Sequence, residues 1–173
     1  MINVSIKALA MAATLAVAAP SQAATVNLVA DSGWSRFAFG DVGTTASRKF
    51  SFTLTKNAIL SVVDGFFAGD VLEVFANAVS LGQTTAPMSG ATNHGMNFDA
   101  AFADTNFSSG QFLLGAGTYS ISLNVLERSA GSGNHLGAIR LDLAAVPLPA
   151  GGALLLSGLG LAALMRRRRR AAE

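Results

Sequence analysis

The sequence of 173 residues contains no cysteine, four prolines, one tryptophan and one tyrosine. The absence of cysteine excludes disulfides, a thiol nucleophile, cysteine-based zinc sites and thioether-linked haem. Two catalytic motifs, Gly-x-Ser-x-Gly and His-Glu-x-x-His, are also missing. The two histidines, His94 and His135, lie in Gly/Asn-rich stretches. We expect both to be solvated polar residues in loops.

The N-terminus has the pattern of a secretory signal peptide. Lys7 is followed by the apolar run 8–19, by Pro20 and by small residues at the −3 and −1 positions of a site that ends at Ala23. This pattern predicts export through the secretion translocon and cleavage by signal peptidase between Ala23 and Ala24. An uncleaved anchor is the alternative, but a run of about a dozen residues is short against the about 20 that a span needs.

The C-terminal segment 146–173 has three parts in a fixed order. Two prolines keep residues 146–150 extended, because proline removes a backbone donor and disfavours helix in the residue before it. An uncharged run rich in Leu, Ala and Gly follows, about 24 Å long as a helix at roughly 1.5 Å per residue. That is short for a hydrocarbon core of about 30 Å, and the flanking residues and snorkelling arginines extend it. A buried soluble helix is the alternative, but such a helix usually keeps a polar face.

A cluster of arginines closes the segment and predicts its orientation. Positive charge remains in the cytoplasm, so the chain before residue 146 is expected to lie outside the inner membrane. The topology-determining residues are Arg166, Arg167, Arg168, Arg169 and Arg170.

This C-terminal segment resembles the PEP-CTERM family of sorting signals, in its VPLPA variant. The matching motif is Val146, Pro147, Leu148, Pro149 and Ala150, followed by the apolar run and the arginines. Leu148 stands where the commoner signal has a glutamate. The resemblance implies a Gram-negative envelope protein that an exosortase recognises and cuts, and that reaches the cell surface or extracellular matrix, often in organisms that make exopolysaccharide. The C-terminal segment would then be a sorting signal that lies transiently in the inner membrane and is removed by cleavage, as the hydrophobic tail of a GPI signal is.

The charge balance changes when both ends are set aside. The whole chain has 12 Lys and Arg against 10 Asp and Glu; without Lys7, the five terminal arginines and Glu173, six basic and nine acidic residues remain, a net charge of −3. The basic character therefore belongs to the tail. No basic patch interleaved with aromatic residues is left in the exported part, which gives no support for nucleic-acid binding.

Residues 24–145 are expected to form one exported domain with an all-β fold, an antiparallel β-sandwich of jelly-roll type. Apolar and polar residues alternate with period 2, most clearly where Phe50, Phe52 and Leu54 share one face. Further short strands are predicted at 26–30, 34–39, 59–63, 71–76, 79–81, 112–114, 119–125 and 139–143. Residues 83–97 are predicted to be an irregular loop, and residues 98–104 to hold one helical turn. The domain would lie between a signal peptide (1–23) and a sorting signal with a single transmembrane helix (146–173).

Two stretches of this domain have weaker resemblances. Residues 50–84 and 107–121 are similar to a pattern in the exported domains of PEP-CTERM proteins. Residues 115–121 are also similar to strands of carbohydrate-binding and pre-peptidase-type sandwiches. These likenesses imply a shared architecture and do not establish a function.

Two sets of residues are candidate ligand sites. Asp64 and Asp70 bracket a turn, and Asp99 and Asp104 lie in a stretch that could fold near it. Ca²⁺ takes about six to eight oxygen ligands, so these aspartates are either a Ca²⁺ site or turn residues that bond their own backbone. The second set could stack on sugar rings or belong to the core; it comprises Trp34, Phe66 and Phe67. Period 2 allows only one of the adjacent Phe66 and Phe67 to point inward.

The first functional hypothesis is a non-enzymatic cell-surface or matrix protein, structural or adhesive, associated with exopolysaccharide or biofilm. The alternative is a carbohydrate-binding module, assisted by Ca²⁺ or not. An extracellular hydrolase is the third hypothesis, and nothing in the spacing of the acidic residues selects a catalytic pair. The expected partners are an exosortase, signal peptidase, the translocon, the inner membrane and exopolysaccharide. No other cofactor is predicted.

Overall fold

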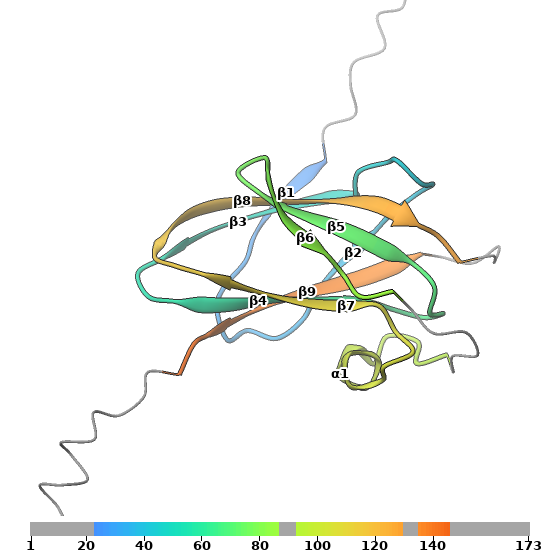
Figure 1. The fold of residues 1–173 in the computed structure, drawn as a ribbon. Coiled ribbons are helices and arrows are strands. Elements are labelled where there is room, and N and C mark those ends of the chain that lie inside the picture. Colours follow the sequence, from blue (N-terminus) through green and yellow to red (C-terminus); the bar gives the residue numbers. More distant parts are fainter. Residues whose placement is uncertain (1–22, 87–92, 130–134, 146–173) are drawn as a thin grey trace, which may run out of the picture.

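The computed structural model describes residues 23–86, 93–129 and 135–145, which form two packed β-sheets and one short helix (Figure 1). The upper sheet contains, in spatial order, β1 (Ala24–Asn27), β3 (Arg48–Leu54), β8 (Gly117–Glu127), β5 (Val71–Ala76) and β6 (Val79–Gln83). The lower sheet contains β2 (Ser35–Ala38), β9 (Leu136–Leu143), β4 (Ala58–Asp64) and β7 (Ser109–Leu114). The predicted all-β fold with two largely antiparallel sheets is confirmed.

The strand pairs are antiparallel apart from one. β1 lies parallel to β3, with Val26 opposite Phe50. The register shifts between Val74 and Phe75 where β5 pairs with β6, and between Val71 and Leu72 where β5 pairs with β8. Several strands extend beyond their predicted bounds, because polar residues at the ends, as in β7, pair through the backbone without contributing an apolar face.

The core lies between the two sheets and comes from the alternating apolar residues of both. Phe50, Phe52 and Leu54 of β3 are buried as the period-2 pattern predicts, and they face Leu60 and Val62 of β4 within one cluster. All residues of this cluster lie between Leu28 and Leu141. Segment 24–145 therefore contains every core residue of the described part of the chain, and we expect it to fold without the flanking segments.

Strand β4 is buried on both faces, which its sequence does not signal by alternation. The helix α1 (Phe98–Ala103) covers the outer face of the lower sheet, and Figure 1 shows it below that sheet. Phe98 and Ala101 of α1 pack against Val63 and Phe107. The predicted helical turn at 98–104 is confirmed, and the side chain of Asn97 caps it by accepting from the Ala100 N–H at 3.1 Å.

The predicted signal peptide, residues 1–23, lies outside the described residues except for Ala23, and the predicted transmembrane helix lies in residues 146–173, also outside them. The sorting motif and the arginine cluster lie there as well. The helix α1 has six residues, and the described part of the chain contains no helix that could cross a bilayer.

Candidate functional site

The loop of residues 65–70, between β4 and β5, is held by an acid–histidine network made of Asp64, Asp70, Ser129 and His135. The backbone N–H of Asp70 donates to Asp64 Oδ2 at 3.1 Å. Asp70 Oδ1 accepts from the Ser129 N–H at 2.7 Å, and Asp70 Oδ2 lies 2.8 Å from His135 Nδ1. The network therefore links the β4–β5 loop to the two ends of the connection between β8 and β9.

Burial dominates the electrostatics of the network. Asp64 is 0 % exposed, Asp70 1 % and His135 8 %. Burial, and next the nearby Asp70 carboxylate, raise the pKa of Asp64 to about 8, against the lowering effect of backbone N–H groups. Asp64 therefore holds a proton at neutral pH. Asp64 Oδ1 and His135 Nε2 are buried without a hydrogen-bond partner among the described residues.

The loop itself is pinned at several points. The N–H of Gly65 donates to the Leu136 carbonyl at 2.8 Å, and that of Phe66 donates to the Gly95 carbonyl at 3.0 Å. Gly69 has φ +135°, and a Cβ at this position would lie 2.5 Å from the Cβ of Ser129. Only glycine fits such a backbone so close to a neighbouring strand end.

The pinned loop presents one aromatic ring to solvent. Phe66 is half-buried with φ 62°, while Phe67 is 54 % exposed. The two side chains therefore differ in exposure, as expected if only one of the two rings points inward. Among the three predicted stacking residues, Phe67 is the one with an open surface.

Trp34 lies in a second group, the Trp34 cluster, formed by Trp34, Asp99, Phe102, Arg140 and Asp142. Trp34 Nε1 donates to Asp99 Oδ1 at 2.8 Å, and the guanidinium carbon of Arg140 lies 4.5 Å from the centroid of the Trp34 ring. The Phe102 ring centroid is 5.6 Å away. Arg140 also donates to Asp99 at 3.0 Å and to Asp142 at 2.8 Å. Trp34 therefore braces α1 against β9, and a sugar that stacked on the same ring face would have to displace Arg140.

The four predicted Ca²⁺ ligands are not gathered in one place. Asp64 and Asp70 are adjacent, whereas Asp99 belongs to the Trp34 cluster. Asp104 accepts from the Asn106 N–H at 2.9 Å and lies 2.9 Å from His94 Nε2; these contacts, the Asn106 N–H first, hold its pKa below the usual value. Among residues 23–86, 93–129 and 135–145, no three His, Asp or Glu side chains are placed to hold a metal ion. The predicted four-aspartate Ca²⁺ set is therefore not assembled.

The expectation that both histidines are solvated is wrong for His135, which is buried against Asp70 and the Phe39 ring. His94 is half-buried and packs on Phe107, with ring centroids 5.0 Å apart. No local pattern marks His135, because its partner Asp70 lies 65 positions away in the chain. The resulting Asp–His pair has no hydroxyl nucleophile on its free nitrogen in the described part of the chain.

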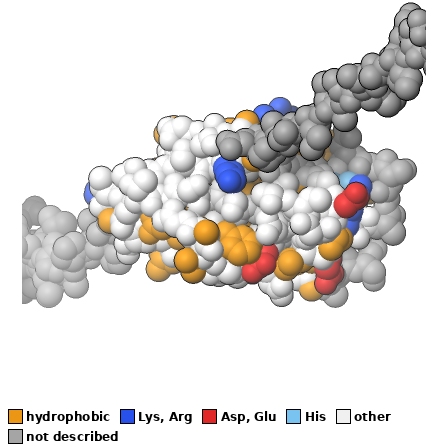
Figure 2. Space-filling view, turned by 90° about the horizontal axis from the view of Figure 1, so that it is seen from above, with side chains coloured by type: hydrophobic (Ala, Val, Ile, Leu, Met, Phe, Trp, Pro, Cys, Tyr) orange, Lys and Arg blue, Asp and Glu red, His pale blue; other side chains and the backbone are white. Residues whose placement is uncertain are grey.

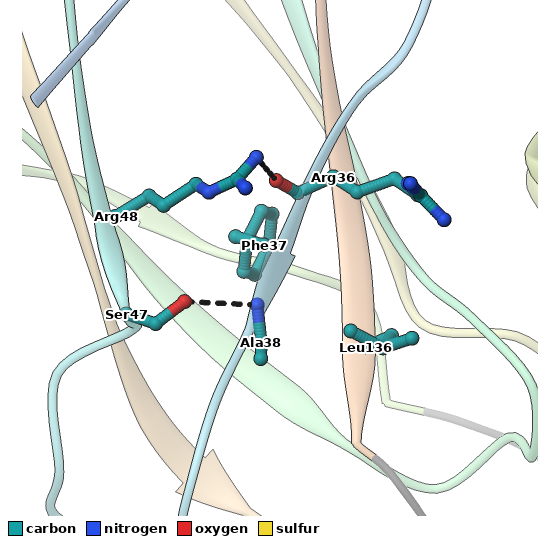
Figure 3. A pocket seen from close by; sticks show the side chains of 6 residues that line it. All are labelled: Arg36, Phe37, Ala38, Ser47, Arg48 and Leu136. Carbon is teal, nitrogen blue, oxygen red and sulfur yellow. Dashed lines mark hydrogen bonds between the residues drawn. The ribbon is translucent and has the colours of Figure 1, made fainter. Parts of the chain in front are cut away.

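A small cavity of about 230 Å³ lies beside β2 (Figure 3). Arg48 extends across it and donates to the Arg36 carbonyl at 2.8 Å, and Ser47 Oγ accepts from the Ala38 N–H at 3.1 Å. The Arg36 side chain points the opposite way in Figure 3. The cavity is smaller than the about 300–1,000 Å³ of ligand pockets. Its side chains satisfy the free edge of β2 and do not converge on a ligand.

Comparisons with known proteins give little further information. No protein-family model matches the chain, and no curated protein matches it. Among solved structures, the chain is similar to the pre-peptidase C-terminal domain of a collagenase from Bacillus anthracis, with 13 % identity and a TM-score of 0.37, over 71 % of this chain and 97 % of that one. A likeness at this TM-score is too distant to transfer a function.

Proposed function

We propose that the protein is an exported, non-enzymatic surface or matrix protein that an exosortase sorts through its C-terminal segment. Its β-sandwich serves a structural or adhesive role in association with exopolysaccharide. The observation that carries the proposal is the order of motif, apolar run and arginine cluster in residues 146–170. This order supplies an extended recognition segment, a membrane helix and a cytoplasmic stop.

The limits of the folded domain support this proposal. β1 begins at Ala24, the first residue after the predicted signal-peptide cleavage. β9 ends at Leu143, shortly before the motif that starts at Val146. Cleavage at both places would leave in the released sandwich every core residue that the structure describes. β9 lies between β2 and β4 in the sheet, so the residues before the motif are anchored centrally.

The strand order supports the jelly-roll assignment. Four antiparallel strands in the order β2-β9-β4-β7 face another four in the order β3-β8-β5-β6, with β1 added at one edge. Two such four-stranded sheets are typical of jelly rolls, which occur in lectin and capsid domains. A binding or structural role without catalysis also agrees with an acid–histidine network that is closed to solvent.

A reporter experiment in the native host tests the sorting proposal. Residues 146–173 are fused to an unrelated exported reporter, with a matched fusion in which Pro147 and Pro149 are replaced by alanine. We expect the first fusion to reach the surface or medium without its tail and the second to stay in the inner membrane with the tail intact. Equal distribution of the two fusions would reject recognition of the motif.

A carbohydrate-binding module is the second candidate, and the exposed Phe67 favours it. Hydrogen bonds at both ends hold the loop, so binding through Phe67 would require little additional ordering. We expect Phe67→Ala to abolish retention on a polysaccharide array. Trp34→Phe should leave retention unchanged, because Arg140 covers the Trp34 ring. Retention of the Phe67→Ala protein at the wild-type level would remove this candidate.

A further inference from the structure

The four edge strands of the sandwich differ in how they are protected against pairing with another strand. β1 and β2 are four residues long. The outer edge of β2 is also covered, because Ser47 and Arg48 bond to its backbone. β6 pairs with β5 through a register shift. Short length, coverage and bulges each discourage pairing of an open edge.

β7 is protected less: among the described residues, only Thr85 covers its outer edge, at the first residue, Ser109. The six residues of β7 pair with β4 in an unbroken register, from Ser109 opposite Val63 to Leu114 opposite Ala58. The strand has no charged residue and no proline. Leu113 on β7 is 69 % exposed, the highest fraction among the large hydrophobic side chains of the described residues. Figure 2, in which the near side of Figure 1 faces down, shows hydrophobic side chains gathered along that side.

The backbone of β7 leaves a defined set of groups open. Thr85 bonds to Ser109 on the side away from β4: its N–H donates to the Ser109 carbonyl at 2.8 Å, and the Ser109 N–H donates to Thr85 Oγ1 at 3.1 Å. Alternate residues of a strand direct their N–H and C=O groups to the same side. The backbone groups of Gln111 and Leu113 therefore also point away from β4. No described residue outside β4 bonds to them.

We propose that β7 pairs antiparallel with β7 of a second copy of this chain, about a twofold axis at Phe112. Gln111 then faces Leu113 of the second copy, and Leu113 faces Gln111. Each of these two pairs exchanges two backbone hydrogen bonds, so the N–H and C=O groups of both residues are all satisfied. The arrangement is self-complementary, as a twofold interface requires.

The neutral edge favours a second copy over a charged partner. Two identical charged strands would repel each other when directly opposite, whereas two copies of β7 bring no charge together. The opposite border of the sandwich carries Arg36, Arg48 and Lys49, so the two borders differ in charge. The inference deepens the proposed structural role by naming a partner. It is tested on segment 24–145, so it can fail while the sorting proposal holds.

Cysteine cross-linking tests the register directly, because the chain has no cysteine of its own. Gln111→Cys and Leu113→Cys variants of segment 24–145 are oxidised separately and as an equal mixture. Facing residues of such a pair have Cα atoms about 5.5 Å apart, within the about 4.4–6.8 Å of disulfides. Identical residues of the two copies, Gln111 with Gln111 or Leu113 with Leu113, are offset by two positions, which displaces them by about 7 Å along the strand direction. Both side chains are exposed, so the fold tolerates the changes.

We expect the mixture to give about tenfold more disulfide-linked dimer than either variant alone. The mixture should also give about tenfold more linked dimer than a control mixture in which Val42→Cys replaces one of the two variants. Val42 is an exposed loop residue far from β7 in the sequence. We also expect sedimentation equilibrium of the wild-type segment to show reversible dimerisation that Leu113→Lys removes and Val42→Lys leaves unchanged. No excess of mixed dimer, or dimerisation unaffected by Leu113→Lys, would overturn the proposal.

Discussion

The protonated Asp64 makes a sharp prediction about the pH dependence of stability. The carboxyl group has a pKa near 8 in the folded protein, against 3.8 for the unperturbed group, because burial disfavours its charge. Between these two values the folded state binds a proton that the unfolded state has released. The contribution of Asp64 to the free energy of unfolding is therefore fully present below the pKa of the unfolded state. It is lost as the pH rises through the pKa of the folded state.

The magnitude follows from the shift. One pKa unit corresponds to about 1.4 kcal/mol, so Asp64 should lower the free energy of unfolding by about 3–4 kcal/mol between pH 5 and pH 8. Asn has nearly the shape of a protonated carboxyl group and does not titrate. The stability of Asp64→Asn relative to wild type should therefore rise by the same about 3–4 kcal/mol over that interval.

Urea unfolding of segment 24–145 at pH 5, 6, 7 and 8 measures this difference, with the fluorescence of the single tryptophan, Trp34, as the signal. Asp41→Asn is the matched control, since the Asp41 side chain is 83 % exposed. Its stability relative to wild type should change little with pH. A change below about 1 kcal/mol for Asp64→Asn between pH 5 and pH 8 would refute the reasoning from burial.

Three further predictions test the contacts around the two clusters. Gly69→Ala should destabilise the domain by about 2–4 kcal/mol in urea, since it adds a clash to a positive φ, whereas Gly33→Ala, also at positive φ but in open space, should cost about 1 kcal/mol; equal losses would contradict the close approach. His135→Ala should cost about 2–3 kcal/mol in the same assay, because it leaves Asp70 Oδ2 buried without this partner; a loss below about 0.5 kcal/mol would contradict it. Trp34→Phe should lower stability by about 1–2 kcal/mol, measured by thermal denaturation, through loss of the indole hydrogen bond and part of the Arg140 contact; an unchanged melting temperature would argue against a bracing role.

The sequence predicted the elements whose pattern is local. The alternation of Phe50, Phe52 and Leu54 marked β3 and its buried face, because one side of that strand packs in the core and the other meets solvent. The helical turn at 98–104 was also predicted. β4 shows the limit of the pattern: α1 covers its outer face, so its residues are buried on both sides and do not alternate.

The candidate site depends on pairings across long sequence separations, which no local pattern shows. Asp70 meets His135, and Trp34 meets both Asp99 and Arg140 only after the sheets have formed. The sequence selected the aspartates and Trp34 as notable residues but not their partners. The four aspartates therefore suggested one Ca²⁺ site, where the structure divides them between separate hydrogen-bonded groups.

The intact mass of the protein recovered from the native envelope and the culture medium tests the central claim most directly. The account predicts a chain that begins at Ala24 and ends within or next to the motif of residues 146–150, with the apolar run and the arginines removed. That result would establish that the C-terminal segment is a sorting signal removed during export and that the sandwich is the mature protein. A mass that retains Arg166 to Arg170 would contradict exosortase processing and indicate a stable inner-membrane anchor.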